Sequence, residues 1–324
     1  KRSDLVRMPR AGLPAGPFTL KDRETGAVVP WQPDGDEVVF VARDVPPCGW
    51  AAYSMESGGE APAVRSRSSG DPLLTAGGFR AAFDLRIGAV TSLWADGVEL
   101  IDPSCPHGLG QFVYEASGKA GDAGYHGSPY DGPGTGRRSP SLRSWRIEEG
   151  PVLSRFIAEG ELEFADFPVE VGSTGRTVQM LSVPRGLGFV ECEVRLEGKR
   201  PSALSEMGHV AFPFQVPEGK FRLDLLGSVA DPEKDLQDGG NRDAFAVQHW
   251  VDVSNGERGI TWCPIEATIT SLGGIRLFQW DPQYVPQNPA QNLICEQTLT
   301  NLVDGQVAEV QCNWAPPVAT EIIV

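Results

Sequence analysis

The chain has 324 residues, of which 40% are hydrophobic and 22% charged, so it can bury a sizeable core without disulfide or metal support. Its formal net charge is −15, from 43 acidic and 28 basic residues. A surface of this sign repels nucleic acid and anionic membranes at long range, so neither is expected as a partner.

Secondary-structure signals favour strands throughout. The chain contains 38 glycines and 27 prolines spread along its length, which is typical of many turns between short strands. No segment of a dozen residues places apolar side chains at helical spacing, and no run approaches 18 apolar residues, so neither an amphipathic helix nor a membrane span is expected. We predict an all-β protein.

Residues 1–60 are predicted to form a small β domain. Residues 37–42 include the consecutive apolar residues Val38 to Val41, a run typical of a strand buried on both faces. Residues 56–70 contain Ser, Gly, Pro and Arg and are expected to be a linker. Further short strands are expected at residues 18–20, 28–29 and 51–53.

Residues 61–324 are predicted to form a large antiparallel β-sandwich. In residues 189–197, Val190, Cys192, Val194 and Leu196 alternate with charged residues, which indicates a half-buried strand. The same alternation occurs in residues 81–87, 221–225 and 245–253.

Residues 117–141 form a long stretch rich in Gly, Ser and Pro without a strand pattern. Loops of this length are usually functional or disordered. Arg137 and Arg138 near its end are candidates for substrate contact if the loop closes over an active site. A solvated surface loop is the alternative.

Two further groups could contact a sugar. Glu206 and His209 could supply an acid and a base at a cleft, the alternative being a loop-end Glu and a His that enters a strand. In residues 245–253, His249 shares a face with Val247 and Val251 and is expected in the core. The opposite face carries Gln248, Trp250 and Asp252, a combination that suits sugar rings and hydroxyls, although packing against a neighbouring domain explains it equally.

The six cysteines form no CxxC pair, so a zinc ribbon is not expected and this chain is predicted to hold no metal. We interpret them as free thiols of a cytoplasmic protein, with disulfides as the alternative if the protein is exported. They are Cys48, Cys105, Cys192, Cys263, Cys295 and Cys312.

Several segments resemble one family. The opening Arg2-Ser3-Asp4-Leu5-Val6-Arg7-Met8-Pro9 and the bend Val45-Pro46-Pro47-Cys48-Gly49-Trp50 are similar to the region after the catalytic barrel in family-38 glycoside hydrolases, the α-mannosidase family. Further similar segments lie at residues 88–94, 99–102, 211–214, 241–254 and 259–264.

The resemblance implies a small β domain followed by a large sandwich of the galactose-mutarotase-like type. In the family both pack on an N-terminal α/β barrel that holds zinc and an Asp nucleophile. The barrel's H-x-H-x-D strand has no counterpart here, because none of the four histidines is followed by Asp two positions later. No catalytic residue is therefore carried over, and zinc is expected only in the barrel.

Three functions are compatible with these observations. The first is a non-catalytic C-terminal β region that buttresses and partly covers the active site of a barrel in the same polypeptide, where a glycoside or oligosaccharide binds. The second is a stand-alone aldose epimerase that uses Glu206 and His209. The third is a carbohydrate-binding module whose platform would be an exposed tryptophan: Trp50, Trp94, Trp250 or Trp280.

Overall fold

The computed structural model describes eight stretches of the chain. Within its strands, the structure describes only the backbone of residues 115–116, 136–137, 206–207, 293–298 and 308–315. The described stretches are residues 1–116, 136–163, 175–199, 206–236, 245–266, 269–272, 293–298 and 308–315.

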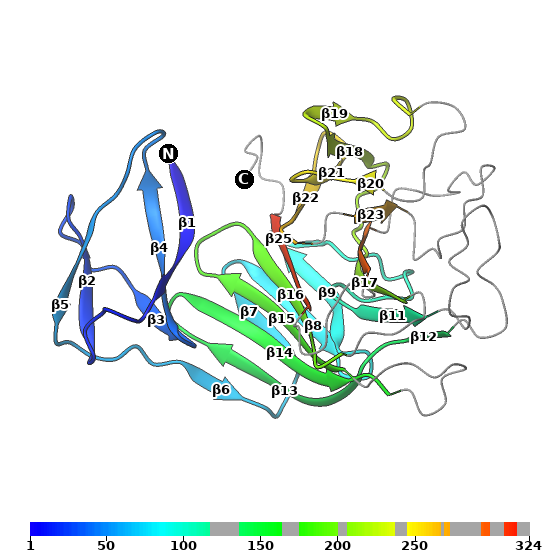
Figure 1. Cartoon of the computed structure of the whole chain (residues 1–324). Helices are drawn as coiled ribbons and strands as arrows, with labels where there is room; N and C mark the ends of the chain where they lie inside the picture. The colour runs from blue at the N-terminus through cyan, green and yellow to red at the C-terminus, as the bar shows by residue number, and fades with distance from the viewer. Residues whose placement is uncertain are drawn as a thin grey trace.

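The first part of the chain forms two small sheets beside a much larger β structure (Figure 1). A three-stranded sheet has the order β1-β4-β3, and a two-stranded sheet pairs β2 with β5. The strands are β1 (Arg2–Pro9), β2 (Phe18–Asp22), β3 (Trp31–Asp34), β4 (Glu37–Val45) and β5 (Tyr53–Ser57).

Strand β4 is buried on both faces, as its run of apolar residues predicts. Val38 and Phe40 pack with Phe18 and Leu20 in the core of the small sheets. Val39 points to the opposite side and joins a second apolar cluster, which includes residues of the larger structure. One strand therefore completes the small core and forms the contact with the rest of the molecule.

The larger part is built around a ten-stranded sheet of order β19-β18-β21-β22-β25-β16-β15-β14-β13-β6. All its pairings are antiparallel. Its strands are β6 (Arg65–Arg67), β13 (Ser141–Glu149), β14 (Leu153–Glu161), β15 (Arg176–Pro184), β16 (Val190–Glu197), β18 (Lys220–Leu225), β19 (Ser228–Ala230), β21 (Val251–Ser254), β22 (Gly259–Pro264) and β25 (Ala308–Ala315).

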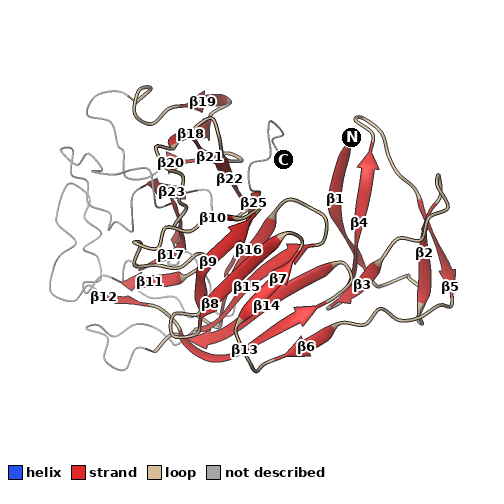
Figure 2. Ribbon diagram, turned by 180° about the vertical axis from the view of Figure 1, so that it is seen from behind, coloured by secondary structure: helices blue, strands red, loops and turns tan. Residues whose placement is uncertain are grey.

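Two further sheets cover this sheet (Figures 1 and 2). One has the order β10-β9-β8-β7 and the other β12-β11-β17-β24-β23-β20. Their strands are β7 (Leu73–Ala76), β8 (Phe79–Asp84), β9 (Ala89–Ala95), β10 (Val98–Glu99), β11 (Phe112–Ala116), β12 (Gly136–Arg138), β17 (Glu206–Phe212), β20 (Phe245–Ala246), β23 (Ile269–Leu272) and β24 (Leu293–Thr298).

Aromatic side chains join the sheets across the main core. Phe83 of β8 stacks on Phe156 of β14 with ring centroids 3.6 Å apart. Phe212 of β17 meets Trp262 of β22 at 5.4 Å. The predicted all-β sandwich is confirmed, since the described residues contain strands and no helix, and consequently no helix long and apolar enough to cross a membrane.

The alternating strand predicted at residues 189–197 is also confirmed. In β16, Val190, Cys192, Val194 and Leu196 are buried and the residues between them are partly exposed. The period of two follows because successive side chains of a strand point to opposite faces, and only one face of β16 meets the core.

The continuous strand predicted at residues 245–253 is wrong. Strand β20 lies in the six-stranded sheet and β21 in the ten-stranded sheet, so the chain crosses between sheets. Val247 and Val251 are both buried because the core lies between the two sheets. His249, expected in the core, is exposed in the crossover, and its Nδ1 lies 2.7 Å from Asp224 Oδ2.

Two segments expected to be irregular contain strands. The expected linker, residues 56–70, includes β6, which pairs with β13. The end of the expected loop, residues 117–141, includes β12, which pairs with β11. Both are short edge strands that a neighbouring strand holds, so their own sequence shows little alternation. Residues 117–135 of that loop lie outside the described residues.

Candidate functional site

A cluster of charged side chains joins the small sheets to the sandwich. Asp34 of β3 accepts hydrogen bonds from Arg7 of β1 at 2.8 Å and from Arg155 of β14 at 2.6 Å. Arg7 also donates to Glu191 of β16 at 2.6 Å. Two carboxylates and two guanidinium groups, from both parts of the molecule, therefore form one connected network.

The two carboxyl groups of this network are shifted in opposite directions. Burial opposes ionisation of Asp34, but the hydrogen bonds and charges of Arg155 and Arg7 outweigh it and lower the pKa of Asp34. Burial raises the pKa of Glu191, and the hydrogen bond and charge of Arg7 together with the charge of Arg155 do not fully compensate. Asp34 therefore carries the more strongly stabilised negative charge.

A buried amide adds a directional contact at the same junction. Gln32 Oε1 of β3 accepts hydrogen bonds from the backbone N–H groups of Val152 and Leu153 at 3.0 and 2.9 Å. Gly150 lies so close that a Cβ there would be 2.1 Å from Gln32 Oε1. Only glycine allows the turn between β13 and β14 to approach this side chain.

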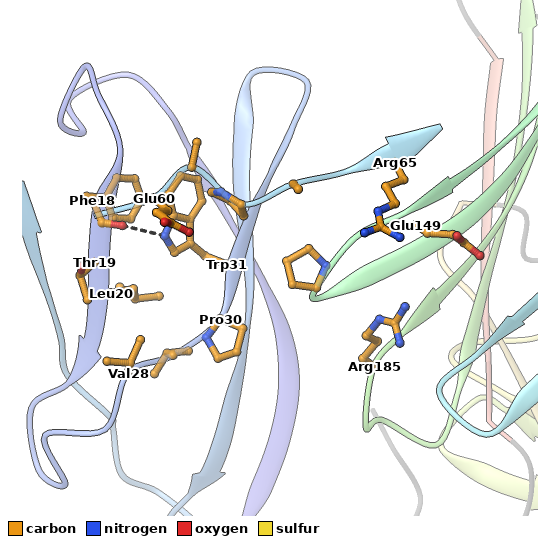
Figure 3. A pocket seen from close by; sticks show the side chains of 15 residues that line it. Phe18, Thr19, Leu20, Val28, Pro30, Trp31, Glu60, Arg65, Glu149 and Arg185 are labelled. Carbon is orange, nitrogen blue, oxygen red and sulfur yellow. Dashed lines mark hydrogen bonds between the residues drawn. The ribbon is translucent and has the colours of Figure 1, made fainter. Parts of the chain in front are cut away.

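A groove runs beside this junction and begins with a hollow of about 680 Å³. Figure 3 shows Leu20 and Trp31 on the side of the small sheets, facing Arg65, Glu149 and Arg185 on the side of the sandwich. The Trp31 side of the hollow is held in place, because the Trp31 ring stacks on the Phe18 ring at 4.1 Å and its Nε1 donates to the Phe18 carbonyl at 2.9 Å.

A second hollow of about 470 Å³ continues the groove. The two hollows share five lining residues, so they adjoin along the same junction. The shared residues are Val28, Val29, Pro30, Pro151 and Arg185. The second hollow adds an aromatic rim formed by Trp50 and Tyr53. This groove between the two parts of the molecule is the candidate functional site.

Tyr53 lies at this rim with its ring against Phe40, at a centroid distance of 4.9 Å. Burial, and after it the charge of Asp22, raises the pKa of the Tyr53 hydroxyl. The hydroxyl therefore stays protonated at neutral pH and remains a hydrogen-bond donor at the edge of the groove.

Among the residues that the structure describes, Cys48 and Cys105 are free thiols, as predicted for them. Across the described stretches, no three His, Cys, Asp or Glu side chains are grouped so that they could hold a metal ion.

The sugar-contact candidates fall into two groups, one on strands β12 and β17 of the six-stranded sheet and one in the crossover and strand β21. Arg137 and Arg138 lie in β12, at the edge of the six-stranded sheet, where they pair with Glu115 and Tyr114. The side chain of Arg137 lies outside the described residues, and that of Arg138 is half-buried.

Glu206 and His209 both belong to β17, in the interior of the same sheet. His209 is fully buried, so it does not face an open cleft. The side chain of Glu206 lies outside the described residues.

Of the three residues predicted to share one strand face, Gln248 and Trp250 lie in the crossover between sheets and Asp252 lies in β21. Gln248 Oε1 accepts a hydrogen bond from the Gly227 N–H at 2.8 Å. The Trp250 carbonyl accepts one from the Asp224 N–H at 3.1 Å. Asp252, in β21, accepts hydrogen bonds from the hydroxyl groups of Ser254 and Thr261, so its carboxylate oxygens are already engaged.

Comparison with known proteins identifies the fold. No family model and no curated protein matches the sequence. Among solved structures, an α-mannosidase from Enterococcus faecalis V583 matches with a TM-score of 0.59 and 10% identity, over 98% of this chain and 42% of that chain. The likeness shows a shared fold.

Two other solved structures also match this chain. A glycosyl hydrolase family 38 protein from Enterococcus faecalis matches with a TM-score of 0.56 and 9% identity, again over 98% of this chain and 42% of that chain. A putative aldose 1-epimerase from Escherichia coli K12 gives a TM-score of 0.43 at 11% identity, over 76% of this chain and 99% of that chain. The chain thus spans less than half the length of the α-mannosidase-type chains it matches.

Sequence reasoning found only one part of the groove. Trp50 is one of the four tryptophans considered as a sugar platform from the sequence. The opposite wall includes Glu149 at the end of β13 and Arg185 in the turn after β15, both far along the chain. No local pattern in those segments indicates that they face Trp31 and Val28, so only the packing of the two parts reveals the groove.

Proposed function

We propose that this chain is the non-catalytic β region of an α-mannosidase-like glycoside hydrolase. In this proposal it supports and partly covers an active site formed by an N-terminal α/β barrel of the same polypeptide, which acts on a glycoside or oligosaccharide. The observation that carries the proposal is the extent of the structural likeness. Nearly the whole chain matches, yet it accounts for only 42% of the α-mannosidase chain.

The junction between the small sheets and the sandwich supports this role. A buttress must hold its parts in a fixed orientation, and here apolar packing of β4, the Arg7–Asp34–Arg155 contacts and the Gln32 hydrogen bonds all join the same two parts. Buried contacts of several kinds resist hinge motion better than a small polar interface does. In this proposal the catalytic zinc belongs to the barrel.

The coding sequence upstream of Lys1 and the activity of the corresponding full-length polypeptide test the proposal together. We expect an upstream α/β barrel with a zinc-binding His and Asp strand, and zinc-dependent hydrolysis of an aryl α-mannoside by the full-length protein. The 324-residue chain alone should show no hydrolysis, with or without added zinc. Turnover by the isolated chain that a chelator abolishes would overturn the proposal.

A polarimetric assay distinguishes the buttress role from the epimerase alternative. Common hexoses are dissolved as single anomers, and the approach of optical rotation to equilibrium is followed with the 324-residue chain present. We expect the uncatalysed rate. A rate that rises in proportion to protein concentration would assign the chain as an epimerase and contradict the buttress role.

A further inference from the structure

Trp50 is an unusually exposed aromatic side chain at the rim of the groove. It is 79% exposed and lines the second hollow. The preceding turn is tight, because the Gly49 N–H donates to the Pro46 carbonyl and a Cβ on Gly49 would be 2.6 Å from Pro46 Cγ. The backbone that carries the indole is therefore already ordered, so binding at Trp50 need not order this loop.

The apolar surface continues from Trp50 into the groove. Val28 is 65% exposed and lines both hollows, together with Pro30 and Pro151. A single exposed apolar residue is common on protein surfaces, but several that line one concave feature indicate a binding surface. This apolar surface is interrupted by charged groups that line the same hollows. It therefore suits a ligand with small apolar faces better than a broad apolar partner.

The second hollow also contains polar groups that the fold leaves available. Asp22 uses Oδ1 to accept the N–H groups of Glu24 and Thr25. The Asp44 and Glu24 carboxylates make no hydrogen bond with any residue in the described stretches. Within the described residues, the Arg43 guanidinium bonds two carbonyl oxygens, each at the long distance of 3.4 Å. Acceptors and donors thus lie side by side here.

The first hollow repeats this arrangement. Glu60, Arg65 and Glu149 line it, and within the described part of the chain their side chains make no ion pair or hydrogen bond with one another or with other residues. A strongly charged ligand would meet groups of its own sign. A neutral polyhydroxylated ligand satisfies both kinds, since each hydroxyl group can donate to a carboxylate and accept from a guanidinium.

We infer that this groove binds a neutral oligosaccharide, with Trp50 as the stacking platform. The C–H face of a pyranose ring packs on the indole, while the carboxylates and guanidinium groups bond the hydroxyls. The two adjoining hollows, of about 680 and 470 Å³, give room for more than one sugar unit. This binding site goes beyond the proposed function, because it requires neither a barrel nor catalysis.

Titration calorimetry on the 324-residue chain tests the inference. The probes are mannotriose, maltotriose and cellotriose, each at millimolar concentration, which covers axial and equatorial hydroxyl patterns. We expect at least one trisaccharide to bind, and Trp50→Ala to weaken that binding at least about tenfold, the equivalent of about 1.4 kcal/mol. Glu60→Gln should weaken it less, because it removes one acceptor at the other end of the groove.

Trp94→Ala is the matched control, because Trp94 is a partly exposed tryptophan on β9, away from the groove. It should leave sugar binding unchanged. Thermal unfolding of Trp50→Ala should match that of the parent chain, since the side chain is exposed. The inference is overturned if no trisaccharide binds, or if binding survives Trp50→Ala. If the groove receives a protein segment instead of a sugar, no trisaccharide should bind. Neither outcome bears on the upstream barrel or on mannoside hydrolysis.

Discussion

At the scale of single residues, Gln32 and Gly150 have the most constrained surroundings at the junction. Gln32 is buried, and one oxygen accepts two backbone N–H groups of the turn after β13. Val152 and Leu153 are buried, so solvent does not readily reach their N–H groups to replace the amide. Leaving buried donors unpaired costs much more free energy than the net value of the hydrogen bonds themselves.

Gln32→Ala should therefore lower the free energy of unfolding by about 2–4 kcal/mol, from two unpaired buried donors and a small cavity. Urea denaturation followed by circular dichroism measures the change. Gln248→Ala is the control, because the exposed Gln248 amide also accepts a backbone N–H but water can take its place. A Gln32→Ala effect no larger than that of the control would contradict this account.

At the scale of elements, some strands are predictable because their environment is simple. The alternation of β16 arises because one face of the strand is buried in the core, and the apolar run of β4 arises because both faces of that strand are buried. Strand β3 is different. It has only four residues and includes Pro33, which removes a backbone donor, so neither length nor alternation indicates a strand. It exists because β4 pairs with it.

The charged network joins four elements, β1, β3, β14 and β16, through Asp34. Asp34→Asn should weaken both arginine contacts and lower the free energy of unfolding by about 1.5–3 kcal/mol at neutral pH. Asp84→Asn is the control, because Asp84 pairs with the highly exposed Arg86 two residues away, and such surface pairs contribute little. Equal effects of the two substitutions would show that the network does not hold the units together.

The network also predicts an opposed pH dependence. The pKa of Asp34 in the folded state is below its usual 3.8, so its contribution is complete at neutral pH and is lost as the pH falls below about 4. The pKa of Glu191 is above its usual 4.5, so the folded state gains stability as the pH falls from neutral towards that value. Glu191→Gln should abolish this gain, as urea midpoints between pH 7 and pH 4.5 would show. An unchanged pH profile in the variant would contradict the assignment.

At the scale of the whole molecule, the small sheets and the sandwich share buried surface. Val39 is completely buried and belongs to the same apolar cluster as Val152 and Phe189 of the sandwich. Separation of the two parts would expose this cluster and leave the Gln32 contacts broken. We therefore expect the small sheets to have little stability without the sandwich.

Unfolding of the 324-residue chain should consequently be one cooperative transition. Tryptophan fluorescence, to which Trp31 of the small sheets and Trp262 of the sandwich core contribute, should give the same urea midpoint as circular dichroism. Two separated transitions would show that the parts are independent. If that happened, Asp34→Asn should leave both midpoints almost unchanged, which makes the two descriptions distinguishable.

The sequence by itself determined the β class, the buried run of β4 and the alternation of β16. These depend on local composition and on which faces meet a core, and both are written in short segments of the chain. It could not determine the crossover at residues 247–250. Val247, just after β20, and Val251, in β21, are both buried in the core, so the alternation of buried and exposed residues continues across the crossover. Only the tertiary structure decided that His249 is exposed, that Asp34 joins Arg7 to Arg155, and that Trp50 stands at a groove. Those features depend on residues far apart in the chain, and sequence spacing carries no information about which of them meet.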